Sequence, residues 1–445
     1  MPPIASTLPR VSNPDAIFDD PLAFLAEARR THGDHAVLRD GVSLLSHSCE
    51  CPGVLALFGT AWHRRVLCAP EDFLVAPSIA PLFALPDAVA RLNRSLHVMA
   101  APDHAVHKRA VAAALTPALL DAHRDAIEHA IARFATAWRA AGSIRLFDAM
   151  QHLCAEIGVR LLFGEGYPPG SPLHLALTRF FGLRRALSGE RLRDPVIAAG
   201  EALDLLLGKA IAGPAMDLPQ QLVGDLPEAM VRAHLNVLFM SLVEPVAVAA
   251  TWTLLVLTQR PRLRQRLRAA RSSAAPHTPP DELARAILET LRLLSPNALM
   301  VRVAARQIEC SGVAIPQGCE IVLAPFLSHR DPAIFVDPSV FQPSRWVGRA
   351  AVPPFAFLPF GAGPHGCVGR RLAELLIAQV VGSVLARVDP VLARSQEIDW
   401  RVDITFRPRS DFEILAGDVE VGSIQGVVPW FGPVADLIDF EPEDP

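Results

Sequence analysis

Apolar residues recur at helical spacing along most of the chain, whereas the alternating pattern of half-buried strands is rare. From Thr116 to Ala141 they return every three or four positions, and Thr116 before Pro117 is typical of a helix start. The same spacing predicts further helices over 21–31, 146–163, 171–187, 195–212, 227–258, 261–271, 281–294 and 369–388. Strand-like runs are fewer and lie at 301–309, 312–316 and 319–324. We expect the last two runs to form a hairpin whose turn is Ile315–Gly318. The pattern therefore predicts a mainly α-helical fold.

The segment from Leu235 to Thr258 is 24 residues long and almost entirely apolar, which is long enough to span a bilayer. Glu244 and Pro245 lie at its centre, where a carboxylate is costly to insert into lipid. A helix that is apolar on all sides can also cross the core of a large soluble protein. We favour the core helix and expect no membrane span.

Composition narrows the classes of protein further. With 445 residues the chain is long enough for three average domains or for one large domain. The 51% of apolar residues and 20% of charged residues exclude a disordered or collagen-like chain. The net charge of −4, with both signs spread along the chain, argues against nucleic-acid binding by bulk charge. Seven unevenly spaced cysteines, and a first segment without a basic and then apolar leader, predict a reduced, cytoplasmic protein.

A cysteine in a glycine-rich loop is the strongest chemical signal. A proline-rich coil runs from about 326 to 366, and Cys367 follows it, just before the predicted helix 369–388. Backbone N–H groups at a helix start stabilise a thiolate, and glycines allow a flat ligand to approach closely. An iron porphyrin bound through that sulfur is the natural partner, with basic residues paired to its propionates. The alternative is a turn around a buried structural cysteine.

The loop from Phe360 to Gly369 (FGAGPHGCVG) resembles the signature FGxGxHxCxG of the cytochrome P-450 superfamily and matches it at every fixed position. The resemblance implies heme b as the cofactor, with the Cys367 thiolate as the iron ligand. It also implies that the fixed positions of the loop contact the bound heme. These positions are Phe360, Gly361, Gly363, His365 and Gly369.

Three further segments resemble the same family. Glu289 and Arg292 resemble its helix-borne ExxR pair, and Arg345 in FQPSRW resembles the arginine that completes a structural triad; a solvated surface pair is the alternative for ExxR. His104 and Lys108 resemble the helix residues that contact the heme propionates, a set that Arg302 and His365 would complete. Lysine at 108 keeps the positive charge that arginine usually supplies, but it cannot form the two parallel hydrogen bonds of a guanidinium group. An exposed helix face is the alternative for His104 and Lys108.

The resemblance spans about residues 20 to 415. It implies a mainly α, single heme domain over 21–418 with a small β-rich region. An irregular segment, 1–20, would precede this domain, and an extension without a family counterpart, 419–445, would follow it. The apolar helix 227–258 would be the long central helix, with the heme between it and the helix that follows the cysteine loop.

The central helix departs from the family pattern. There the family carries an acid followed by an alcohol that delivers protons to dioxygen, and this chain has Glu244 followed by Pro245. Proline removes one N–H, frees the carbonyl of Ser241 and kinks a helix. The feature resembles the peroxygenase branch, whose arginine-proline pair goes with use of hydrogen peroxide. With Glu244 in place of that arginine, we expect carboxylate substrates to be repelled. The alternative is a drifted helix in which water delivers protons.

These observations predict a soluble, bacterial-type heme-thiolate enzyme that oxidises an apolar small molecule in secondary metabolism. Glu244 and Pro245 are the predicted catalytic positions, and electrons would come from a ferredoxin-type partner or from hydrogen peroxide, because no dinucleotide fingerprint is found. A heme-thiolate isomerase, dehydratase or coupling enzyme is the alternative, and a heme sensor or carrier is a remote one. A metal cluster at His47, Cys49 and Cys51 lacks a second group of ligands at zinc-like spacing.

Overall fold

The computed structural model describes residues 3–46, 50–75, 85–185, 193–213, 217–273, 281–348, 352–403, 405–417 and 427–441. The chain forms two compact units. The first unit consists of Met1–Val111, Asn297–Pro338 and Ala350–Val368. The second unit consists of Ala112–Pro296, Ser339–Arg349 and Gly369–Pro445.

A five-stranded sheet organises the first unit, in the order β1-β2-β8-β5-β3. Its strands are β1 (His35–Asp40), β2 (Gly53–Leu57), β3 (Phe73–Val75), β5 (Met300–Ala304) and β8 (Glu320–Leu323). All five residues of β2 and all four of β8 are buried, because these strands lie inside the sheet with side chains covered on both faces. The helices of this unit are α1 (Pro21–His32), α2 (Thr60–Leu67), α3 (Asp87–Arg91) and α14 (Pro325–Ser328), and α4 (Asp103–Ala114) continues into the second unit.

The predicted hairpin over the turn Ile315–Gly318 is wrong. The hairpin of this region pairs β6 (Ile308–Cys310) with β7 (Val313–Ile315), through Ser311 and Gly312 at φ values of 53° and 75°. Two successive residues with positive φ suit the twist of a tight hairpin. Strand β8 instead pairs with β2 and β5, since a strand that is buried on both faces needs a neighbour on each side.

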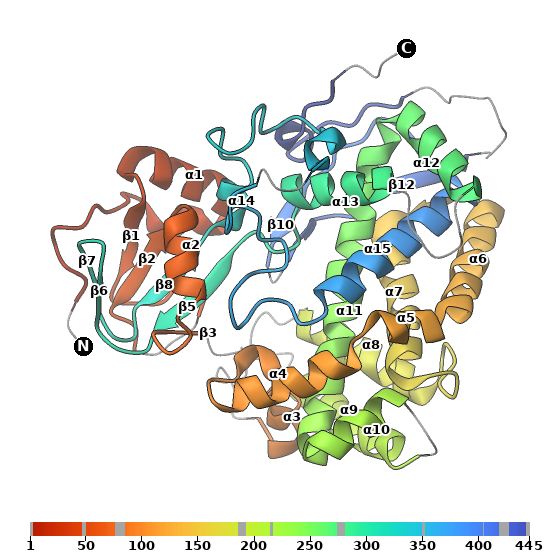
Figure 1. The fold of residues 1–445 in the computed structure, drawn as a ribbon, viewed down its shortest axis with the longest axis horizontal. Coiled ribbons are helices and arrows are strands. Elements are labelled where there is room, and N and C mark those ends of the chain that lie inside the picture. The colour runs from red at the N-terminus through yellow and green to blue at the C-terminus, as the bar shows by residue number, and fades with distance from the viewer. Residues whose placement is uncertain are drawn as a thin grey trace. The chain divides into compact units, whose positions relative to one another are not determined.

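The second unit is helical and is built around α11 (Glu228–Thr258), close to the predicted range 227–258. Helix α11 packs against α7, α9, α13 and α15, which surround it in Figure 1. Within it, the stretch apolar enough to cross a membrane is 83% buried by the chain itself, as expected of a core helix. The other helices are α5 (Pro117–Ala122), α6 (Arg124–Ala141), α7 (Leu146–Phe163), α8 (Pro172–Arg185), α9 (Arg193–Ile211), α10 (Asp217–Asp225), α12 (Pro261–Ser273), α13 (Asp281–Leu293) and α15 (Arg370–Leu385).

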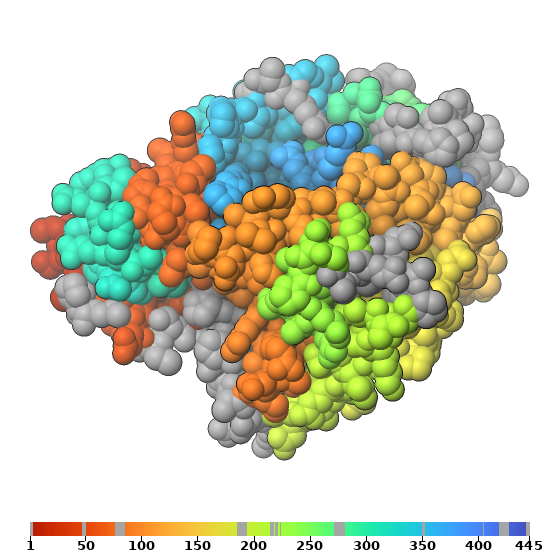
Figure 2. Space-filling view, turned by 60° about the horizontal axis from the view of Figure 1, so that its bottom comes forward, coloured from red at the N-terminus to blue at the C-terminus, as the bar shows by residue number. Residues whose placement is uncertain are grey.

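Two features of the second unit were not expected from the pattern. The predicted helix 116–141 is divided into α5 and α6 at His123, whose carbonyl begins the new helix. Two small sheets are also present: β4-β12-β9 (Ser143–Arg145, Glu413–Gly417, Asp389–Leu392) and β10-β11 (Trp400–Val402, Phe406–Pro408). In Figure 2, α9 and α10, coloured yellow-green, lie at the surface of this unit, and both contact α11.

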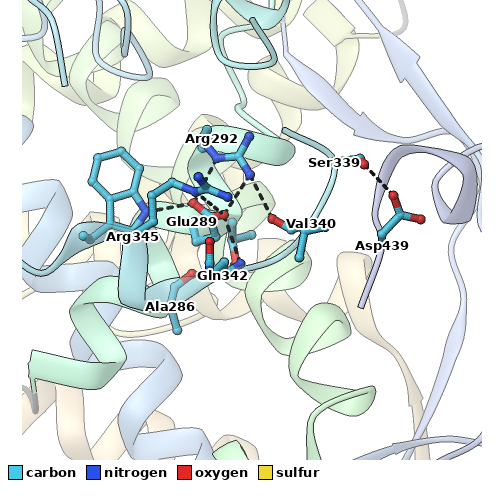
Figure 3. Close-up of polar contacts among 10 residues, drawn as sticks. Ala286, Glu289, Arg292, Ser339, Val340, Gln342, Arg345 and Asp439 are labelled. Atoms are coloured by element: carbon cyan, nitrogen blue, oxygen red, sulfur yellow. Dashed lines mark hydrogen bonds and ion pairs between the residues drawn. The ribbon is translucent and has the colours of Figure 1, made fainter. Parts of the chain in front are cut away.

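Residues 427–441, which we call the C-terminal strap, pack on the second unit. Asp439 forms a β-bridge with Val340, and its carbonyl accepts a 2.9 Å hydrogen bond from the N–H of Phe341. The ring of Phe440 lies 6.2 Å from the ring of Phe341 and 5.8 Å from that of Trp430. The strap therefore fastens the irregular coil that leads into Gln342 (Figure 3).

We expect a chain that ends at residue 426 to be less stable than one that ends at residue 441. The shorter chain loses the buried side chains of Trp430, Val434 and Ile438, and it uncovers Phe341. Burial of one large apolar side chain contributes roughly 1.5–3 kcal/mol, so the free energy of unfolding should fall by several kcal/mol. Urea titrations of the two chains measure this difference, and coincident midpoints would show that the strap is energetically neutral.

Candidate functional site

Cys367 is exposed at the end of a tight loop in the first unit. Its backbone N–H donates to the carbonyl of Phe360 at 2.8 Å, and the N–H of Gly366 donates to the carbonyl of Gly363 at 3.0 Å. These bonds close the loop on itself and present the sulfur at its rim. Gly369, two residues further on, is the N-cap of α15.

Two glycines of this loop cannot be replaced without strain. Gly361 and Gly363 have φ values of 66° and 69°, a conformation that side chains disfavour. A Cβ atom on Gly363 would also lie 2.0 Å from the carbonyl oxygen of Leu67. The loop therefore needs glycine at 363 for both its conformation and its close contact with α2.

A cluster of basic groups lies beside the loop, and we call it the basic cluster: His104, Lys108, Arg302 and His365. The rings of His104 and His365 are 3.9 Å apart between centroids. The Lys108 ammonium donates to the carbonyl of Gly366 at 2.8 Å and also to that of Pro364. Lys108 thus ties α4 to the cysteine loop.

The basic cluster is short of negative charge. Burial lowers the pKa of Arg302 to about 10, and burial with the neighbouring cationic groups lowers the pKa of His365 to about 4. The pKa values of His104 and Lys108 are also lowered, mainly by burial. Among the described residues, no carboxylate contributes to any of these four shifts.

This arrangement fits an iron porphyrin. Two propionates would supply the negative charge that the basic cluster lacks, and Cys367 offers a thiolate ligand beside it. The Cys367 sulfur is near enough to Lys108 to oppose the fall of the lysine pKa. The structure thus brings together in one unit five residues that the sequence assigned to the cofactor.

The predicted triad is formed in the second unit (Figure 3). Glu289 and Arg292 are fully buried and joined by two hydrogen bonds, of 2.7 Å from Nη2 to Oε1 and 2.9 Å from Nε to Oε2. The Nε of Arg345 lies 3.2 Å from Glu289 Oε1. A buried, bidentate ion pair excludes the alternative of a solvated surface pair.

Sequence reasoning missed two further donors to Glu289. The indole Nε1 of Trp346 donates to Oε2 at 2.8 Å, and the backbone N–H of Gln342 donates to Oε1 at 3.1 Å. Trp346 follows Arg345 in the same 3-10 helix, η5 (Pro343–Trp346), so a buried tryptophan beside the arginine was the available signal. The carboxylate is thereby satisfied on both oxygens.

Glu244 is buried on α11 and is held by the loop and second strand of the β10-β11 hairpin. The hydroxyl of Thr405 donates to its Oε1 at 2.6 Å, and Nε of Arg407 lies 3.6 Å from the same oxygen. Neither partner was predicted, because both lie more than 150 residues away in the chain.

Pro245 lies inside α11 without ending the helix, which continues to Thr258. Around it, the central part of α11 is buried except along one stripe, formed by Val237, Met240, Ser241 and Pro245. These positions recur every three or four residues, so they share one face of the helix. We call this face the accessible stripe.

The alternative metal cluster near the N-terminus gains no support. His47 and Cys49 lie outside the described residues. Cys51 is buried, which raises the pKa of its thiol, and its sulfur donates to the carbonyl of Gly53. Within the described part of the chain, no three metal-ligating side chains come together.

Residues 203–399 match the family model of cytochrome P450. Over 417 residues the chain is 25% identical to cyclooctat-9-en-7-ol 5-monooxygenase of Streptomyces melanosporofaciens, covering 86% of this chain and 87% of the relative. A mitochondrial 25-hydroxyvitamin D-1 alpha hydroxylase from Mus musculus is 34% identical over 181 residues, which are 38% of this chain and only 34% of that relative. The match thus spans about a third of the mouse protein.

Solved structures share the fold of this chain. A retinoic acid-bound cyanobacterial CYP120A1 superposes with a TM-score of 0.76 at 17% identity, covering 93% of this chain and 99% of the other. A 6-coordinated cytochrome P450 from Thermus thermophilus gives a TM-score of 0.70 at 23% identity, covering 92% and 100%. At these identities the superpositions speak for the fold alone.

Proposed function

Because this chain belongs to the cytochrome P450 family, we propose that it is a heme-thiolate oxidoreductase that oxidises an apolar small molecule. The observation that carries the proposal is the exposed Cys367 beside four basic groups whose pKa values are lowered by burial, without a contribution from any carboxylate among the described residues. A bound heme supplies the oxidising chemistry, because a thiolate ligand donates electron density to the iron and favours O–O cleavage. The chain supplies the ligand, the counter-ions of the propionates and the groups that handle protons.

The accessible stripe of α11 supports an apolar substrate. Three of its four residues, Val237, Met240 and Pro245, have no polar side-chain group that would need a partner. The Streptomyces relative is named for cyclooctat-9-en-7-ol, a molecule that is mostly hydrocarbon. Burial of α11 within the chain supports a soluble protein.

Glu244 is the proton-handling group of this proposal, and hydrogen peroxide is the oxidant. The Glu244 carboxylate would take a proton from one oxygen of hydrogen peroxide and return it to the other, which leaves as water. The remaining oxygen atom would pass to the substrate through the oxidising chemistry that a bound heme supplies. Because Pro245 follows it, α11 has no hydroxyl at the next position to deliver protons to dioxygen. Turnover with dioxygen, a reductant and a ferredoxin-type partner would then lose much reducing power as peroxide.

We expect Glu244→Gln to suppress peroxide-driven turnover by roughly 10²-fold, the lower end of what general acid–base catalysis contributes. The substitution keeps the shape of the side chain and removes the base, so heme content and substrate binding should stay unchanged. Initial rates with hydrogen peroxide, normalised to heme, measure the effect. Pro245→Thr restores a hydroxyl and should raise the fraction of reductant that ends in product.

Two outcomes would contradict this proposal in different ways. Tight coupling of reductant to product in the unmodified protein, with no response to peroxide or to Glu244→Gln, would leave a monooxygenase that uses ordered water. Product that contains no oxygen from labelled peroxide or dioxygen would favour an isomerase, dehydratase or coupling enzyme instead.

A further inference from the structure

The β10-β11 hairpin is attached to α11 at two points, both within the second unit. The hydroxyl of Thr405 donates to Glu244 Oε1 at 2.6 Å, and Nε1 of Trp252 donates to the carbonyl of Phe406 at 3.2 Å. The rings of Trp252 and Phe406 also lie 5.8 Å apart between centroids. These contacts fix the hairpin along about two turns of the central helix, so the position of Thr405 relative to Glu244 is set by packing.

Alternating charges connect Glu244 with the solvent through the same hairpin. Arg407 lies 3.6 Å from Glu244 and 2.7 Å from Asp403, and Asp403 lies 2.7 Å from Arg401. Side-chain exposure rises along this series, from 7% at Glu244 and 11% at Arg407 to 36% at Asp403 and 43% at Arg401. Arg407 compensates the charge of the buried carboxylate, and Asp403 in turn holds Arg407 in place.

A threonine hydroxyl suits a carboxylate that gains and loses a proton. It donates to the carboxylate when that group is ionised, and it can accept from the carboxylic acid when that group is protonated. The Glu244 Oε1 atom therefore keeps a hydrogen-bond partner in both states, without movement of the backbone. Pro245 has no hydroxyl, so the described residue next to Glu244 in sequence cannot serve in this way.

We propose that Thr405 and Arg407 are positioning residues for Glu244, through which the β10-β11 hairpin sets the orientation of the carboxylate and supports its proton transfer. The inference rests on the proposed function, because it takes Glu244 as the proton-handling group. The hydroxyl that binds the Glu244 carboxylate thus comes from Thr405, directly before β11 and 161 residues further along the chain. Neither side chain is assigned contact with the substrate.

The test uses the heme-loaded full chain and peroxide-driven oxidation of guaiacol, a phenol that requires no knowledge of the natural substrate. Thr405→Val removes the hydroxyl and keeps the shape, whereas Thr405→Ser keeps the hydroxyl. Thr253→Val is the matched control, since Thr253 is a buried threonine of α11 whose hydroxyl donates to Ala249 within the helix. Arg401→Gln is the control for the exposed end of the charged series.

We expect Thr405→Val to lower kcat for peroxide about tenfold or more, a part of the effect of removing the base itself. Its KM for peroxide and its heme content should stay near those of the unmodified protein. Thr405→Ser, Thr253→Val and Arg401→Gln should each remain within about threefold of the unmodified rate. Thr405→Val added to Glu244→Gln should cause little further loss, because both act on one step.

Three results would overturn the inference while leaving the heme assignment intact. They are an unchanged kcat in Thr405→Val, an equal loss in Thr253→Val, and losses from Thr405→Val and Glu244→Gln that multiply in the double variant. Failure of the proposed function would show differently, as a ferrous carbonyl spectrum without the thiolate band in the unmodified protein. If the unmodified protein oxidises guaiacol and Glu244→Gln leaves that rate unchanged, Thr405 has no proton-handling group to position and the inference fails as well.

Discussion

Cys367→Ser is expected to abolish the red-shifted, thiolate-type Soret band of the ferrous carbonyl complex. The sulfur of Cys367 lies at the end of the glycine loop and beside the basic cluster, and serine offers no thiolate in its place. A serine hydroxyl at this position is a far weaker donor of electron density than a thiolate. Absorption spectra of the reduced, carbon monoxide-treated protein before and after the substitution measure the change.

Cys68→Ser is the matched control for this experiment. Cys68 is also exposed and lies in the first unit, at the end of α2, but it is outside the glycine loop. The control variant should keep the band. Survival of the band in Cys367→Ser, or its loss in Cys68→Ser, would move the iron ligand away from Cys367.

Glu289→Ala and Arg292→Ala are expected to yield little folded, heme-loaded protein. Both side chains are fully buried, and removal of one leaves an uncompensated charge that costs roughly 3–5 kcal/mol. Glu289→Ala should be the more harmful of the two, because Arg292, Arg345 and Trp346 all lose an acceptor. The ratio of heme to protein and the midpoint of urea unfolding measure these effects.

An exposed ion pair of the same helical region supplies the control. Arg266 on α12 pairs with Glu282 on α13 at 2.9 Å, with 59% and 29% of the side chains exposed. Because exposed pairs contribute at most about 1 kcal/mol, Arg266→Ala should retain heme and nearly all of its stability. Normal heme loading and stability in Glu289→Ala and Arg292→Ala would show that the triad is not needed for folding or for heme binding.

Local sequence patterns were enough to predict those elements and motifs whose residues are neighbours in the chain. The bounds of α7 and α11 follow from apolar runs that begin and end within a few residues of the predicted limits. The cysteine loop was recognisable because its glycines and Cys367 are contiguous, and their conformations depend on each other through short hydrogen bonds. The ExxR pair was recognisable for the same reason, since one helical turn separates its charges.

The pairing of strands that are distant in the chain depended on burial, which cannot be read from the periodicity of apolar residues. Strand β8 was expected to pair with its neighbour across the turn Ile315–Gly318, yet it pairs with β2 and β5. All four of its residues are buried, and a strand covered on both faces gains more between two strands than at the end of a hairpin. The sequence reveals that Ile321, Val322 and Leu323 are apolar, but not which strands flank β8.

The contrast between local motifs and distant partners also applies to the charged groups of the site. The sequence by itself determined that Cys367, the basic cluster, the triad and Glu244 are present, because each lies in a short motif or in a conspicuous break of one. Only the tertiary structure decided that Trp346 binds Glu289, that Thr405 and Arg407 hold Glu244, and that the C-terminal strap fastens the coil before Gln342. The physical reason is that a buried charge must find partners wherever packing brings donors within reach, and no local pattern encodes that position.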